Sequence, residues 1–168
     1  MRTSIGRSRS ILARAAMAAA ALVSVAGLTA ALPATAHAAG AVQAANSCWS
    51  GPNVTNWQGI TFRSRTCPTW TGVNVYEATG QNAQGKYVYT GYLNAGNNWV
   101  VCQTRGDRNP SLGGGTNDIW LYTQGDTTKS LPARKAWGWI PATAVSYGAN
   151  NAAVPGVPWC SSYPGYLP

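Results

Sequence analysis

Two short stretches, Ile119-Trp120-Leu121-Tyr122 and Trp137-Gly138-Trp139-Ile140, decide the fold of this 168-residue chain. In each stretch aromatic residues alternate with aliphatic residues or glycine, and Tyr87-Val88-Tyr89 repeats the pattern. Successive side chains of a β-strand point to opposite faces of its sheet. The alternation therefore predicts three strands, each with its rings on one face.

The rest of the chain after residue 38 is also typical of short strands. Runs rich in Val, Ile, Tyr, Trp and Thr are separated by Gly, Asn, Asp and Pro, and helical periodicity is absent. We predict strands over residues 59–63, 73–77, 87–93, 99–103, 118–123 and 137–141, with one helical turn over 142–145. The fold class is all-β.

The N-terminal residues have the pattern of a secretory signal. A basic stretch precedes an Ala-rich apolar run over residues 15–32, and Ala36-His37-Ala38 matches a signal-peptidase site. We predict a signal peptide over 1–38, a disordered linker over 39–47 and a secreted, extracellular or wall-associated protein. The single histidine of the chain, His37, leaves with the signal.

Composition narrows the function classes. Without histidine the usual general base and metal ligand are missing, so we predict no enzyme and no cofactor. A glycosidase with paired carboxylates stays open, with four acids as its candidates: Glu77, Asp107, Asp118 and Asp126. The basic residues after residue 38 are scattered, and no later run is long and apolar enough to cross a bilayer. We therefore predict neither a nucleic-acid partner nor a membrane span.

All four cysteines lie beyond the predicted cleavage site. An even number in an exported chain predicts two disulfides, for which three pairings are possible. We favour Cys48–Cys67 and Cys102–Cys160, because these bonds clip each end of the domain to nearby structure. No Cys-x-x-Cys pair is present, so we predict no metal site.

The aromatic side chains suggest a binding surface. Eight Trp and eight Tyr exceed what one small interior is expected to hold. With Val88, Ile119, Leu121 and Ile140 in the core, the rings of the three alternating stretches would form an exposed platform for sugars or peptides. Its members are Tyr87, Tyr89, Trp120, Tyr122, Trp137 and Trp139. The alternative is that these rings are themselves the core.

Several segments resemble, in chain order, the strands of a bacterial Src-homology-3-type (SH3-like) domain. They are Val73-Asn74-Val75-Tyr76, the turn segment 91–96, Trp99-Val100-Val101-Cys102, Ile119-Trp120-Leu121-Tyr122, and the closing Trp137-Gly138-Trp139-Ile140-Pro141 with 142–145. The resemblance covers residues 73–146, although Tyr76 stands where the family usually has Arg. It implies a small, strongly bent β-barrel that binds without catalysis and commonly targets peptidoglycan.

Together these observations predict a domain plan and a function. We expect an N-terminal extension over 48–72, an SH3-like barrel with a C-terminal strap over 73–160, and a tail over 161–168. The expected partner is a cell-wall polymer, namely peptidoglycan or a related glycan, or an extended peptide. The alternative is an extracellular protein-interaction or inhibitor module that binds a secreted protein. The proline-rich strap is either a structural element or an internal ligand of the aromatic groove.

Overall fold

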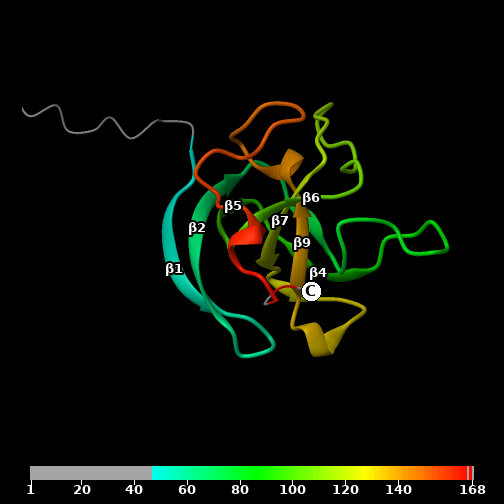
Figure 1. Cartoon of the computed structure of the whole chain (residues 1–168). Helices are drawn as coiled ribbons and strands as arrows, with labels where there is room; N and C mark the ends of the chain where they lie inside the picture. Colours follow the sequence, from blue (N-terminus) through cyan, green and yellow to red (C-terminus); the bar gives the residue numbers. More distant parts are fainter. Residues whose placement is uncertain (1–46, 166, 168) are drawn as a thin grey trace, which may run out of the picture. The chain divides into compact units, whose positions relative to one another are not determined.

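The computed structural model describes residues 47–165 and residue 167, so the predicted signal peptide and all but the last residue of the predicted linker lie outside the described residues. Within this part of the chain the fold is all-β, with nine strands in two antiparallel sheets and three single-turn 3₁₀ helices (Figure 1). No helix among these residues is long and apolar enough to cross a membrane.

The smaller sheet has three strands in the order β1-β2-β5. These are β1 (Trp49–Thr55), β2 (Thr61–Thr69) and β5 (Gly96–Val100). The side chain of Asn56 closes the β1–β2 hairpin, because its Oδ1 accepts hydrogen bonds from the backbone N–H groups of Gln58 (3.0 Å) and Ile60 (2.9 Å). Strand β1 was not predicted, since Gly51 and Pro52 interrupt its pattern, and the structure accommodates them at an irregularity in register between Ser50 and Asn53.

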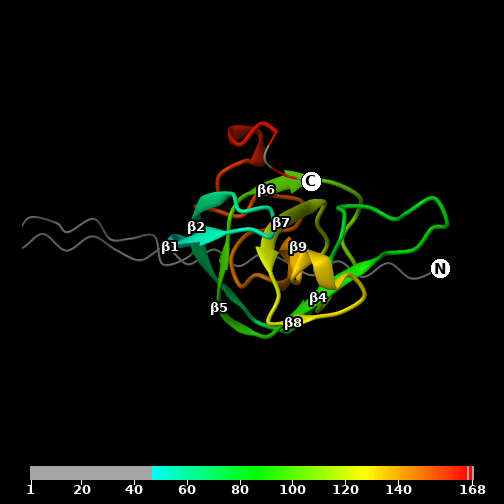
Figure 2. The same ribbon diagram turned by 90° about the horizontal axis from the view of Figure 1, so that it is seen from below.

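The larger sheet has six strands in the order β6-β7-β9-β3-β4-β8. Its members are β3 (Val73–Tyr76), β4 (Tyr89–Leu93), β6 (Gln103–Arg105), β7 (Ile119–Gln124), β8 (Thr127–Thr128) and β9 (Trp137–Pro141). Strands β7 and β9, which contain the two stretches quoted first, are neighbours in register, with Tyr122 opposite Trp139. Figures 1 and 2 show the smaller sheet beside this central pair.

One predicted strand, over residues 99–103, is divided between the two sheets. Strand β5 ends at Val100, β6 begins at Gln103, and the intervening residues bond to Tyr122 of β7. The Val101 N–H donates to the Tyr122 carbonyl at 2.8 Å, and the Tyr122 N–H donates to the Cys102 carbonyl at 2.9 Å. The strand predicted over residues 137–141 is β9 with the same ends, the other predicted strands are present with shifted ends, and the predicted turn is the 3₁₀ helix Ala142–Ala144.

Both faces of the six-stranded sheet are buried. On one face an aliphatic core includes Ile119, Leu121 and Ile140, each fully buried as predicted, whereas Val88 is only half-buried and lies outside that core. On the other face lies an aromatic cluster, which we define by its rings: Phe62, Tyr76, Trp120, Tyr122, Trp137 and Trp139. The two disulfides are Cys48–Cys67 and Cys102–Cys160, which confirms the favoured pairing.

Candidate functional site

The predicted exposed platform is wrong for four of its six rings. Trp120 and Tyr122 are 0% exposed, Trp137 is 2% and Trp139 is 4% exposed. The alternation did place these rings on one face, but other parts of the chain cover that face. Phe62 from β2 joins these rings in the aromatic cluster and Tyr163 from the C-terminal end packs against it, so the rings are core.

The other two platform residues, Tyr87 and Tyr89, are half-buried at the edge of the same cluster. Their rings meet Tyr76 edge-on at centroid distances of 5.0 Å and 5.2 Å. Burial is the main cause that raises the pKa of Tyr76 to about 12. The pKa of Tyr87 is also raised above its ordinary value, first by burial and second by the nearby Asp107 carboxylate. All six residues are therefore brought together, but they face inward.

Two other indoles reach solvent. Trp70 is 50% exposed and Trp159 is 41% exposed. Neither belongs to an alternating stretch, which is why sequence patterning did not single them out. Trp70 is held in place, because its Nε1 donates to the Thr143 carbonyl at 2.8 Å.

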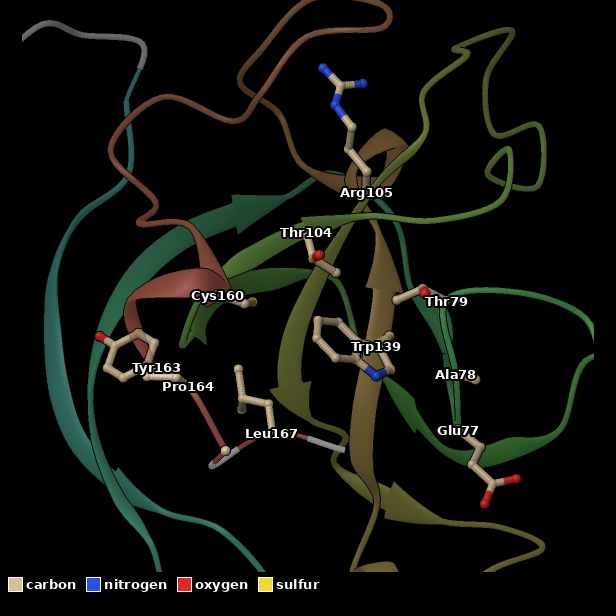
Figure 3. Close-up of a pocket in the computed structure, with 11 residues that line it drawn as sticks. Glu77, Ala78, Thr79, Thr104, Arg105, Trp139, Cys160, Tyr163, Pro164 and Leu167 are labelled. Carbon is tan, nitrogen blue, oxygen red and sulfur yellow. The ribbon is translucent and has the colours of Figure 1, made fainter.

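A cavity of about 400 Å³ opens above Trp139 (Figure 3). Three segments surround it: the residues after β3, strand β6 and the C-terminal end of the chain. Its lining residues are Glu77, Ala78, Thr79, Thr104, Arg105, Trp139, Cys160, Tyr163, Pro164, Gly165 and Leu167. This pocket is the candidate functional site.

Strand pairing brings the walls of the pocket together. Strand β3 pairs with β9 at Tyr76 and Trp139, so the residues that follow Tyr76 run beside the indole. The loop after β6 approaches them closely, since the Asp107 N–H donates to the Thr79 carbonyl at 2.7 Å. A Cβ on Gly106 would lie 2.4 Å from that carbonyl oxygen, so only glycine permits this approach.

The charged groups of the pocket lie at its rim and are paired. The Glu77 carboxylate accepts from the Arg134 guanidinium at 3.1 Å, and Arg105 forms an ion pair with Asp118. In Figure 3 the charged ends of Glu77 and Arg105 both point away from Trp139. The centre of the pocket is therefore suited to an uncharged group.

Three polar groups at the pocket have no hydrogen-bond partner among residues 47–165 and 167. They are the indole N–H of Trp139 and the hydroxyl groups of Thr79 and Thr104, none of which is enclosed completely. In Figure 3 Tyr163 and Leu167 lie to one side of Trp139, Thr79 lies on the opposite side, and Thr104 lies above the indole. The pocket thus has one hydrogen-bonding wall and one apolar wall, as ligand pockets commonly do.

Sequence reasoning did not predict this site, although it had named three of its lining residues in other roles: Trp139 as a ring of the platform, Glu77 as a candidate acid and Cys160 as a disulfide partner. The remaining residues come from a strand end, a loop and the tail, and no spacing in the sequence links them. A comparison with protein-family models finds no match, and neither the curated proteins nor the solved structures contain a similar chain.

Proposed function

We propose that this protein is a secreted, non-catalytic binding module for bacterial cell-wall peptidoglycan, and that the pocket above Trp139 holds the ligand. The observation that carries the proposal is that three residues lining a cavity of about 400 Å³, Thr79, Thr104 and Trp139, each have an unpartnered polar group among the described residues. That volume falls within the range of roughly 300–1,000 Å³ common for small-ligand sites.

The chemistry of the pocket favours an amide with a methyl group beside it. The indole N–H donates, and each threonine hydroxyl both donates and accepts, so together they match the C=O and N–H of an amide. With residues 161–168 in place, the apolar side chains of Pro164 and Leu167 lie across the pocket and suit the methyl group of a short ligand. Peptidoglycan presents this combination in the N-acetyl groups of its sugars and in the alanyl residues of its peptides.

Two disulfides support export, because such bonds persist in oxidising compartments. The SH3-like barrel remains our interpretation of the fold, and the order of the strands over residues 73–146 supports it. A binding role without catalysis is supported by the acids of the pocket: Glu77 is its single carboxylate and is paired with Arg134, whereas glycoside hydrolysis generally requires two carboxylates.

The first test is co-sedimentation of residues 39–168 with purified peptidoglycan. Titrations with N-acetylated chitooligosaccharides and with alanyl peptides then distinguish the two sources of the amide. Because one hydrogen bond contributes about 1 kcal/mol, Thr79→Val and Thr104→Val should each weaken binding about fivefold.

The matched control is Thr128→Val, since Thr128 is an exposed threonine on β8 outside the pocket. The proposal is overturned if the parent chain binds no wall material. It is also overturned if both pocket variants bind as tightly as the Thr128→Val control.

A further inference from the structure

The apolar wall of the pocket is supplied by the end of the chain itself. We call residues 154–160 the strap and residues 161–168 the tail. The strap runs along β6, where Trp159 bridges Gln103 in parallel and the Gln103 N–H donates to the Pro158 carbonyl at 2.9 Å. Figures 1 and 2 show this red segment over strand β6.

Beyond the strap, the tail contacts the body of the protein mainly through two side chains. Tyr163 packs edge-on against Phe62 with ring centroids 5.6 Å apart, and Tyr163 and Leu167 both pack against the aromatic cluster. Figure 3 shows both side chains on the same side of Trp139. The tail therefore covers an apolar surface next to the polar wall of the pocket.

The backbone of tail residues 161–165 and 167 makes no hydrogen bond to either sheet. Among the described residues its backbone hydrogen bonds are local, from the Ser162 N–H to the Trp159 carbonyl (3.1 Å) and from the Tyr163 N–H to the Cys160 carbonyl (2.9 Å). The covalent anchor is the Cys102–Cys160 disulfide, which stands immediately before the tail. The described residues of the tail are thus held by two anchoring side chains and not by backbone pairing. A short peptide that docks in a groove through its side chains is held in this way, whereas a strand that joins a sheet is held by its backbone.

We propose that the tail is an internal ligand of this groove. Tyr163 and Leu167 occupy the apolar half of the groove, and the open pocket is its polar half. A longer external ligand must displace the tail in order to bind both halves. The disulfide keeps the tail at a high local concentration near the groove. The apparent affinity of the protein for an external ligand is then reduced in proportion to the fraction of time for which the groove is free of the tail. The identity of the external ligand rests on the proposed function, whereas binding of the tail does not.

The decisive experiment uses the protein truncated after Cys160, which keeps both disulfides. A synthetic peptide of residues 161–168 is titrated into it by calorimetry. We expect saturable binding, and binding at least about tenfold weaker to the full-length chain, whose own tail competes. A peptide with Tyr163→Ala and Leu167→Ala should not bind, whereas a matched control with Ser161→Ala and Ser162→Ala should bind normally, since both serines are exposed.

A second variant guards against loss of folding in the truncated protein. The full-length chain with Tyr163→Ala and Leu167→Ala keeps its length but loses both anchors, and it should bind the peptide as the truncated chain does. The inference is overturned if the folded variants bind no peptide at concentrations of about 1 mM, the order expected for a tethered segment. It is also overturned if neither variant folds, because the tail is then a structural part of the domain.

Co-sedimentation with peptidoglycan separates this inference from the proposed function. Truncation should raise the apparent affinity for wall material about tenfold. If the peptide binds but no form of the protein binds the wall, the proposed function fails and the internal ligand stands. If wall binding is strong and unchanged by truncation, the tail does not regulate the pocket and that part of the inference is wrong.

Discussion

Gln103 of β6 and Val154 of the strap exchange two hydrogen bonds. The Val154 N–H donates to Gln103 Oε1 at 2.7 Å, and Gln103 Nε2 donates to the Val154 carbonyl at 3.2 Å. The same Nε2 donates to the Val157 carbonyl at 2.7 Å, and Gln103 is only 2% exposed. One buried side-chain amide therefore holds both ends of the turn from Val154 to Val157, in the way that a neighbouring strand would.

Replacing this glutamine should loosen the strap. Gln103→Ala leaves the Val154 N–H and the Val157 carbonyl without partners, whereas the Val154 carbonyl keeps the Val157 N–H at 3.3 Å. We therefore expect the free energy of unfolding to fall by about 2–3 kcal/mol. Amide hydrogen exchange at Val154 should accelerate more than exchange in β7. Chemical denaturation and exchange mass spectrometry measure the two effects.

Gln124→Ala is the matched control, because Gln124 Nε2 makes one exposed hydrogen bond, to the Lys135 carbonyl at 2.8 Å. This variant should lose less than about 1 kcal/mol. Equal losses in the two glutamine variants would show that the strap does not depend on Gln103.

The two disulfides should differ in their contribution to stability. Cys102 and Cys160 are 58 residues apart, whereas Cys48 and Cys67 are 19 apart. From loop-closure entropy, replacing both cysteines by alanine should lower the free energy of unfolding by about 4 kcal/mol for the longer loop and about 3 kcal/mol for the shorter one. Urea denaturation of the two double variants tests the order, and a larger loss for the shorter loop would contradict it.

The buried rings of the aromatic cluster should be required for folding. Trp120→Ala removes a fully buried indole and its 2.7 Å hydrogen bond to the Asp107 carbonyl, so we expect a loss of about 3–5 kcal/mol. Trp159→Ala, at a position 41% exposed, should lose less than about 1 kcal/mol. Thermal unfolding followed by circular dichroism compares them, and a fully stable Trp120→Ala protein would show that the cluster is not core.

Stability should fall at alkaline pH because of Tyr76. Burial, followed by repulsion from the neighbouring tyrosines, raises the pKa of Tyr76 from 10.0 to about 12. Between these values the unfolded chain releases this proton and the folded protein keeps it, so the free energy of unfolding decreases as pH rises. The contribution of the protonated Tyr76 hydroxyl to the free energy of unfolding is fully present below pH 10 and is lost by about pH 12.

Tyr76→Phe keeps the ring and removes the titrating hydroxyl. The decrease in stability between pH 10 and 12 should therefore be shallower in this variant than in the parent protein. Urea denaturation across this pH range provides the comparison. Identical slopes would mean that Tyr76 does not titrate differently in the folded and unfolded states.

Local pattern was sufficient to predict most of the strands. Alternation over residues 119–122 and 137–140 identified β7 and β9, because successive side chains of a strand point to opposite faces and here one face is aliphatic and the other aromatic. The parity of the cysteines predicted two disulfides, and the expectation that each end is clipped selected the correct pairing. Strand β1 was missed since Gly51 and Pro52 break the pattern at its irregular register.

Local pattern could not decide whether a face is covered. The rings of Trp120 and Trp139 share a face as expected, but Phe62 and Tyr163 cover that face from positions far away in the sequence. Similarly, Thr79, Thr104 and Leu167 meet around one cavity only because sheet pairing and the Cys102–Cys160 disulfide bring their segments together.

The amino-acid sequence by itself determined most of the strands, which cysteines are available to join, and which side chains leave each strand together. These properties depend on backbone geometry over a few residues. The tertiary structure alone decided that the aromatic face is interior and that the pocket lies beside the tail. Burial depends on which distant segments pack against a face. Many weak contacts together select those segments, and such contacts produce no periodic pattern in the sequence.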